Sequence, residues 1–119
     1  MSIEEDHARF LRCIGEATRL QILKLLADGE RCVGELAVAL NKEQSLISHH
    51  LRAFKECNIV RDRQEAQKVY YRLADGRIAG LVLGSEALMK ELSLCECQEV
   101  DYERKGNQGS GEGQICPDS

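Results

Sequence analysis

Cysteine is the residue type best able to do chemistry in this chain of 119 residues, which contains six. The first residues, Met1 to Asp6, lack the basic and apolar regions of a signal peptide, so we expect a soluble, cytoplasmic protein with reduced thiols. In that setting, metal binding or redox chemistry is more usual for cysteines than a disulfide framework. Cys95 and Cys97 stand two residues apart among polar neighbours. Packing does not explain them there, so they are the first candidates for chemistry.

Sulfur ligands without a nearby histidine select soft ions. The candidates are As(III), Sb(III), Cd(II), Pb(II) and Hg(II), and Zn(II) also accepts thiolates. Residues two apart on an α-helix point about 200° apart. Cys95 and Cys97 can therefore share an ion only if the helix has ended before them. Either Cys57 or Cys116 could supply a third thiolate.

The other thiols have competing explanations. Cys13 lies on the apolar side of a predicted helix, so we expect it in the core. Cys57 is explained equally well as a small core side chain or as an ion ligand. The role of Cys32 stays open.

Composition and charge favour a helical, DNA-binding domain. The only proline is Pro117 and aromatic residues make up 4%, which favours helices. The net charge is −4, which argues against non-specific coating of nucleic acid, yet residues 42–72 carry seven Lys or Arg against four Asp or Glu. Such a restricted basic segment is typical of a sequence-specific DNA-binding protein. The longest apolar stretch, residues 78–84, is far shorter than the ~18 residues of a membrane span, so we expect no membrane partner.

Hydrophobic periodicity predicts five helices and one β-hairpin. Helices are predicted over residues 3–14, 18–28, 33–40, 44–57 and about 75–94, and strands over residues 59–64 and 68–73. Gly29, Asn41 and Asn58 stand where helices are expected to end. We expect one domain over residues 1–97 and a disordered, acidic, Gly-rich tail over residues 98–119.

This order of elements (ααααββα) predicts a winged helix-turn-helix, mainly α with a small β-hairpin. The helix over residues 44–57 would turn polar side chains to base edges and bury its apolar face, while basic hairpin residues would meet phosphates or an adjacent minor groove. His50 is expected to pack within the fold. No enzyme motif of the phosphate-loop, zinc-protease or serine-hydrolase type is present, so we expect no enzyme. The candidate DNA-binding residues are Gln44, Ser45, Ser48, His49, Arg52, Lys55, Arg61, Arg63 and Lys68.

Several segments resemble those of the ArsR/SmtB repressors, a family of dimeric winged-helix proteins. They are residues 16–23 (EATRLQIL), 36–40 (LAVAL), 45–52 (SLISHHLR), 59–60 (IV) and 70–73 (YYRL). The resemblance implies a homodimer that binds double-stranded operator DNA and releases it when a metal or metalloid ion binds. It also implies that the first and last helices pair across a two-fold axis, with Ile78, Leu81, Val82 and Leu88 contributing.

The family's ion sites are only partly present. Its third-helix arsenic or cadmium site keeps Cys32 here but has Gly34 in place of the second thiol, and its last-helix zinc site would require ligands at Arg77 and Leu88, which cannot bind zinc. Cys57 resembles a ligand of the branch that senses cadmium and lead. The expected ion ligands are therefore Cys57, Cys95 and Cys97, with Cys116 as a further possibility. The alternative is a repressor switched by cysteine oxidation, through a disulfide between the C-terminal thiols or across subunits.

Overall fold

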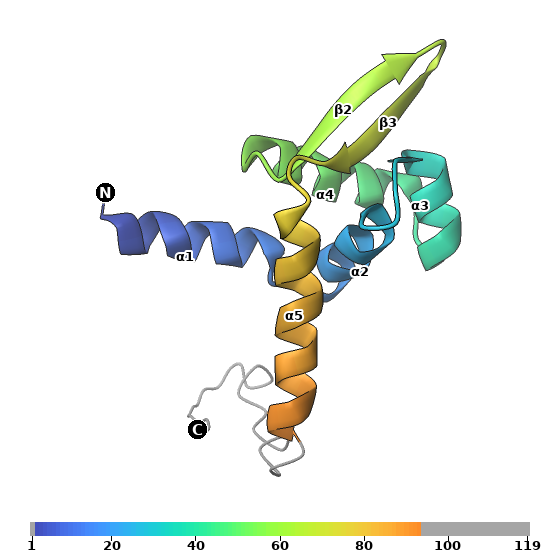
Figure 1. The fold of residues 1–119 in the computed structure, drawn as a ribbon. Helices are drawn as coiled ribbons and strands as arrows, with labels where there is room; N and C mark the ends of the chain where they lie inside the picture. The colour runs from blue at the N-terminus through green and yellow to red at the C-terminus, as the bar shows by residue number, and fades with distance from the viewer. Residues whose placement is uncertain (1, 94–119) are drawn as a thin grey trace. The chain divides into compact units, whose positions relative to one another are not determined.

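The computed structural model describes residues 2–93 of the chain (Figure 1). It confirms the five predicted helices and the hairpin. The expected domain end at residue 97, the tail, and Cys95, Cys97 and Cys116 lie outside the described residues. Among the residues that are described, no helix is long and apolar enough to cross a membrane. The elements in chain order are α1 (Ile3–Ile14), α2 (Ala17–Leu26), β1 (Arg31–Cys32), α3 (Val33–Leu40), α4 (Gln44–Glu56), β2 (Val60–Glu65), β3 (Lys68–Leu73) and α5 (Arg77–Leu92).

Local chemistry explains where the helices begin and end. Ser2 caps α1 by accepting a hydrogen bond from the Glu5 amide, while the Glu5 carboxylate accepts one from the Ser2 amide, both at 3.1 Å. Asn41 ends α3 in the left-handed conformation, with φ of 56°, and Asn58 follows α4 with φ of 61°. Asparagine tolerates this region better than most residues. Helix α2 ends at Leu26 with Ala27 as its cap, two residues before the predicted end, so Gly29 is not the cap. Gly29 lies in the turn that follows and has a positive φ of 141°.

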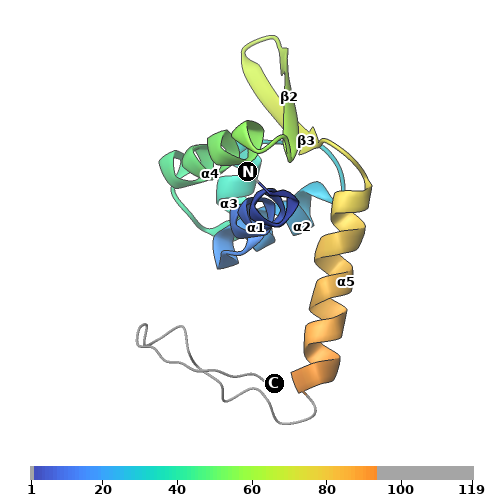
Figure 2. The ribbon, with the colours of Figure 1, turned by 90° about the vertical axis from the view of Figure 1, so that its left-hand side faces the viewer.

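The sheet contains one strand that the sequence does not predict. Its strand order is β1-β3-β2 and both pairings are antiparallel. β1 has only two residues, of which Cys32 lies opposite Tyr70. A two-residue strand shows no alternation of polar and apolar residues, so it becomes recognisable only through its partner. Figure 2 shows the hairpin of β2 and β3, the wing, projecting beyond α2, α3 and α4.

The core lies among α2, α3, α4 and the base of the wing. Its side chains repeat at helical spacing in α2 and α4, which gives each helix one buried face. Burying a side chain of this size contributes about 1.5–3 kcal/mol, so these residues fix α4 against the rest of the domain. The largest fully buried side chains are those of Ile22, Leu23, Leu36, Ile47, Leu51, Phe54 and Ile59.

Helix α5 runs through the boundary between two compact units, Met1–Leu83 and a second unit that begins at Gly84. In the first unit, Ile78 and Val82 are buried in the core of the chain itself. The expectation that these two side chains contribute to a subunit interface is therefore wrong. Leu81, by contrast, is 41% exposed. In the described part of the second unit, Leu88 is 56% exposed.

Candidate nucleic-acid interface

Helix α4 presents the polar face that the sequence predicts for DNA binding. Gln44, Ser45, His49, Arg52 and Lys55 are exposed on it, and Ser48 is half-buried. The opposite face, with Ile47, Leu51 and Phe54, is fully buried. The helix is thus held by its apolar side and leaves side chains suited to base edges and phosphates free to face a ligand.

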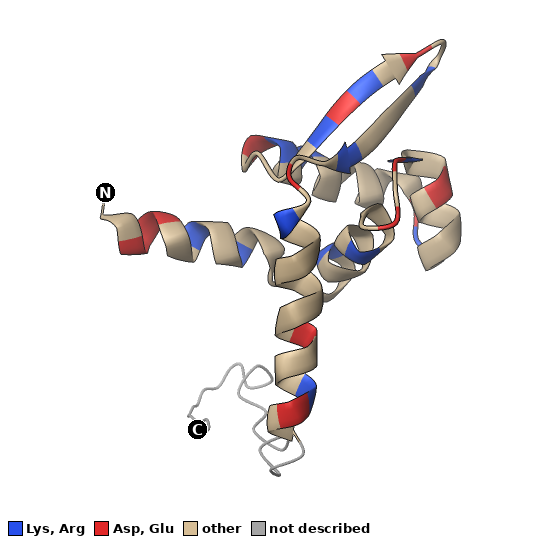
Figure 3. Cartoon of the chain, in the orientation of Figure 1, with Lys and Arg blue, Asp and Glu red and all other residues tan. Residues whose placement is uncertain are grey.

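Basic side chains continue from α4 onto the wing. Figure 3 shows Lys and Arg on α4 and on both wing strands, whereas the first turn of α1 is acidic. Arg61, Arg63 and Lys68 are all exposed, as the prediction requires. Within residues 2–93, no ion pair engages Arg52, Arg61 or Lys68, so their charges are available to an anion.

Lys55 is paired with an acidic residue of the wing. Its Nζ atom lies 2.8 Å from Oδ2 of Asp62, which joins the last turn of α4 to β2. This hydrogen bond raises the pKa of Lys55 and lowers the pKa of Asp62. A phosphate that contacts Lys55 must therefore compete with the carboxylate of Asp62.

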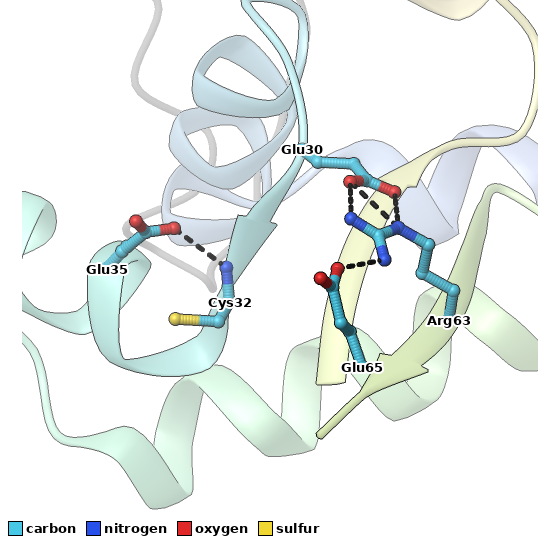
Figure 4. Close-up of polar contacts among 5 residues, drawn as sticks. All are labelled: Glu30, Cys32, Glu35, Arg63 and Glu65. Carbon is cyan, nitrogen blue, oxygen red and sulfur yellow. Dashed lines mark hydrogen bonds and ion pairs between the residues drawn. The ribbon is translucent and has the colours of Figure 1, made fainter. Parts of the chain in front are cut away.

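Arg63 is held more firmly. Its guanidinium binds Glu30 through two nitrogens, with Nε 2.8 Å from Oε2 and Nη2 2.9 Å from Oε1, and Nη1 lies 2.6 Å from Oε1 of Glu65 (Figure 4). It also stacks over the ring of Tyr70 at 5.0 Å from the centroid. The two carboxylates raise the pKa of Arg63, and Arg63 lowers the pKa of Glu30. Arg63 thus braces the wing against the segment that leads into β1.

Arg72 is a basic residue of this surface that the sequence reasoning missed. In the antiparallel register, Arg72 lies directly opposite Arg61, and both are exposed. Both residues line a surface hollow together with Lys55 and Asp62. The available signal was the tight turn between Glu65 and Lys68, because a two-residue loop fixes which residues face each other across the hairpin.

A partly buried polar network around His50 joins α4 to α2. Arg19 of α2 donates a hydrogen bond from Nε to Nδ1 of His50 at 3.0 Å and another from Nη1 to the Cys13 carbonyl at 3.0 Å. Glu16 accepts from the Arg19 amide at 2.9 Å, and its Oε1 lies 3.9 Å from Nε2 of His50. Burial lowers the pKa of His50, so the neutral ring accepts the hydrogen bond from Arg19. His50 is only 8% exposed, which confirms its expected packing role.

The thiols within the described residues do not form an ion site of three or more ligands. Residues 2–93 contain no group of three or more His, Cys, Asp or Glu side chains that could hold an ion. Cys32 is buried, and its amide donates to Oε1 of Glu35 at 3.0 Å at the start of α3 (Figure 4). Cys57, half-buried, ends α4. Cys13 is buried, as expected. Its thiol lies 3.8 Å from the Ala53 carbonyl oxygen, and Cys57 is one of the groups that raise its pKa; the sequence did not indicate that the two cysteines are neighbours.

Known proteins resemble this chain over its winged helix-turn-helix. The model of the family described as "Bacterial regulatory protein, arsR family" matches residues 16–62. The chain is 39% identical over 79 residues to the uncharacterised HTH-type transcriptional regulator MJ1325 of Methanocaldococcus jannaschii, covering 66% of this chain and 89% of that protein. It is 38% identical over 77 residues to the transcriptional repressor SmtB of Mycobacterium tuberculosis, covering 65% of this chain but only 57% of that protein.

A third relative is the arsenic resistance transcriptional regulator ArsR1 of Pseudomonas putida. It is 44% identical over 63 residues, which cover 52% of this chain and 49% of that protein. The chain thus spans about half of this regulator and somewhat more than half of SmtB.

Solved structures share the fold. HlyU from Vibrio cholerae is 34% identical, covers 74% of this chain and 97% of its own, and has a TM-score of 0.65. A homodimeric winged helix-turn-helix fragment of Mb0332 from Mycobacterium bovis is 34% identical, covers 75% of this chain and 82% of its own, and has a TM-score of 0.69. HlyU of Vibrio cholerae is named as a transcriptional activator, and Mb0332 as a possible ArsR-family transcriptional regulator. The chain therefore belongs to the ArsR family of DNA-binding transcription regulators, with the winged helix-turn-helix fold that its sequence predicts.

Proposed function

We propose that this protein is a cytoplasmic repressor that binds operator DNA as a homodimer and releases it when a thiophilic ion binds. In this proposal α4 enters the major groove, and its exposed residues Gln44, Ser45, Ser48, His49 and Arg52 face base edges. The wing lies along the DNA backbone, where Arg61, Arg63 and Lys68 contact phosphates together with Lys55 from the last turn of α4.

The opposition of Arg61 and Arg72 is the observation that best supports DNA binding. Like charges directly opposite each other on a hairpin are unfavourable. Neither residue forms an ion pair within residues 2–93, and the same hollow also contains Lys55 together with its partner Asp62. A phosphate group bound in this hollow would offset the repulsion between the two arginines. DNA binding would thus explain why two arginines stand opposite each other on the wing.

Removing one arginine tests this role. We expect Arg61→Ala and Arg72→Ala each to weaken binding to operator DNA and to reduce the slope of log affinity against log salt by about one unit. Arg12→Ala on α1 removes the same charge outside the proposed interface and should leave the slope unchanged. Fluorescence anisotropy at several salt concentrations measures the slopes. An unaltered slope for both wing variants would remove the wing from the interface.

Apolar side chains on the surface support dimerisation. Leu11 on α1 is 45% exposed and Leu81 on α5 is 41% exposed, and the related Mb0332 fragment is named as homodimeric. Two recognition helices in one dimer would enter successive major grooves about 34 Å apart. Exposed leucines on the first and last helices support the pairing that the family resemblance implies.

The proposed inducer is As(III), Sb(III), Cd(II) or Pb(II), bound by Cys57, Cys95 and Cys97, with Cys116 as an alternative third ligand. Cys57 supports this choice because it is half-buried at the end of the recognition helix. The relative from Pseudomonas putida is named for arsenic resistance. An ion that prefers the low-affinity conformation by about 1–3 kcal/mol would give a usable switch.

Titration of the reduced, metal-free protein with Cd(II) tests the ligands. Operator release and the ultraviolet sulfur-to-metal band are followed together in the native protein, Cys57→Ser, Cys116→Ser and the Cys95→Ser, Cys97→Ser double variant. Loss of release with retained DNA binding identifies a ligand, whereas unchanged release in the double variant contradicts the proposed site. Release by peroxide in metal-free buffer, reversed by a dithiol, would instead support the oxidation switch.

A further inference from the structure

Two cysteines from distant parts of the chain meet at the end of α4. Ala53 is their common neighbour: its carbonyl accepts the Cys57 amide at 3.1 Å and also the Cys13 thiol at 3.8 Å. Cys57 is also one of the groups that raise the pKa of the Cys13 thiol, which places the two side chains next to each other. Cys13, in the last turn of α1, is thus placed at the residue that ends the recognition helix.

The two thiols differ in how deeply they are buried. Cys13 is 6% exposed and belongs to the hydrophobic core, whereas Cys57 is half-buried at its edge. Burial and the neighbouring Cys57 raise the pKa of Cys13 to about 12. Cys57, at the edge of the core, is the thiol that a ligand can reach first.

We propose that Cys13 and Cys57 form a binding site for a thiophilic centre that is satisfied by two sulfur ligands. The chemical class comprises Hg(II) and trivalent arsenic that already carries one carbon substituent. This inference goes beyond the inducer site proposed above because it assigns a role to Cys13 and needs none of the C-terminal thiols. It does not depend on operator release.

The charge of the complex and the number of ligands that the centre needs both favour Hg(II) and arsenic with one carbon substituent. Two thiolates and Hg(II) make a neutral unit, which suits a site lined by core residues, whereas two bare thiolates would not be tolerated there. Among residues 2–93, no third His, Cys, Asp or Glu joins the pair to complete a three-ligand site. Ions that require three or more ligands are therefore served poorly by these two residues alone.

The reaction needs no oxidant. Hg(II) displaces one proton from each thiol and forms two S–Hg bonds. An arsine oxide, R–As=O, forms two As–S bonds with the two thiols, and its oxygen leaves as water with both thiol protons. In neither case does the oxidation state of sulfur, mercury or arsenic change.

The site can be tested in the full chain with Cys95, Cys97 and Cys116 replaced by serine. This variant is loaded with HgCl2 or with phenylarsine oxide and then washed with a monothiol at about millimolar concentration. The monothiol competes for the bound Hg(II) or arsenic. When two neighbouring sulfurs of one chain hold it, a sulfur that lets go rebinds quickly, so an adduct that survives the wash requires such a pair. We expect one adduct per chain by mass spectrometry under native conditions, with loss of two titratable thiols.

Single substitutions identify the two sulfurs. Adding Cys57→Ser or Cys13→Ser should reduce the retained adduct by at least about tenfold, because only one sulfur remains. Cys32→Ser removes a different buried thiol and should leave retention unchanged. Circular dichroism checks folding, and the half-buried position of Cys57 keeps that variant informative if Cys13→Ser unfolds the chain. Retention in Cys57→Ser, loss in Cys32→Ser, or no adduct in the starting variant would each overturn the proposal.

Discussion

Arg63 has an observed role as a brace of the wing and a proposed role in DNA binding, and both roles need the same guanidinium. Its contacts with Glu30 and Glu65 hold the wing, and the wing is the element on which the proposed phosphate contacts depend. Residues at positions 30 and 63 are far apart in sequence, so this brace is a feature of the folded domain. To bind DNA, Arg63 must give up at least one of its hydrogen bonds to Glu30 or Glu65 and donate to a phosphate oxygen instead.

Glu30→Gln tests this exchange. We expect the substitution to raise DNA affinity at low salt and to steepen the salt dependence by up to about one unit, because Arg63 gains freedom to contact a phosphate. Glu4→Gln on α1 makes the same change of charge outside the proposed interface. If the two variants have equal salt slopes, Arg63 serves only as a brace.

Ala66 occupies a strained position at the tip of the wing. Its φ is 57°, and it is the first of the two residues between Glu65 and Lys68. Within the described residues, Gln67 is not among those with positive φ. Positive φ at the first loop residue alone is the pattern of a type II′ turn, which favours glycine there. The absence of glycine explains why the turn type was not evident from the sequence.

We therefore expect Ala66→Gly to stabilise the domain. Relief of left-handed strain contributes about 1–2 kcal/mol, and the greater freedom of glycine in the unfolded chain offsets about 0.5–1 kcal/mol of it. The free energy of unfolding, measured in urea, should rise by roughly 0.5 kcal/mol. Ala79→Gly, inside α5, should lower it by about 1 kcal/mol. A decrease for Ala66→Gly would mean that this turn is not under strain.

At the scale of elements, the recognition helix is held by two kinds of contact. Its apolar face, which includes Phe54, packs in the core, and His50 joins it to α2 through Arg19. Three ionisable groups act on His50: Glu16 and Arg19 from α2 and His49 from its own helix. Because the pKa of His50 in the folded state lies below its ordinary value of 6.5, the unfolded chain binds this proton first as the pH falls.

The lowered pKa of His50 determines how the stability of the domain depends on pH. We expect the free energy of unfolding to fall as the pH is lowered from about 7 to about 5, because protonation favours the unfolded state in this window. His50→Gln keeps an acceptor for Arg19 and should flatten this decline, whereas His7→Gln on the exposed side of α1 should not. Glu16, whose pKa is lowered from 4.5, adds its effect only at more acidic pH. An equal decline in all three proteins would contradict the role of His50.

Elements and contacts differ in how far the sequence could predict them. The helices over residues 3–14 and 33–40 match their predicted bounds because a repeated helical period and clear end signals specify them locally. β1 was missed because two residues carry no period. The Arg19–His50 and Arg63–Glu30 contacts join residues 31 and 33 positions apart. The pattern of polar and apolar residues in the sequence shows that these residues are polar. It does not show which of them are in contact, because that depends on how the helices and strands pack.

At the scale of the whole molecule, the charge of the chain fits its proposed use. A net charge of −4 disfavours indiscriminate attraction to DNA, while the basic segment over residues 42–72 contains most of the proposed interface. One such interface provides few phosphate contacts. A two-fold dimer doubles the number of phosphate contacts. Once one subunit is bound to its half-site, binding of the other subunit to the second half-site is intramolecular.

Leu88→Glu tests whether operator binding depends on that dimer. Leu88 is 56% exposed on α5, so a charged side chain there leaves the core of the chain intact. In the proposed dimer interface, however, the same negative charge would be buried with no opposite charge beside it. We expect a folded monomer by analytical ultracentrifugation and a loss of operator affinity of about 100-fold or more, because the second half-site no longer binds intramolecularly. Val38→Glu alters an equally apolar side chain, 83% exposed on α3, and should leave the protein dimeric. If Leu88→Glu remains a dimer, the last helix does not carry the interface. If it becomes a monomer with unchanged affinity, each subunit binds the operator independently, and an inducer could not act by altering the spacing of the two recognition helices.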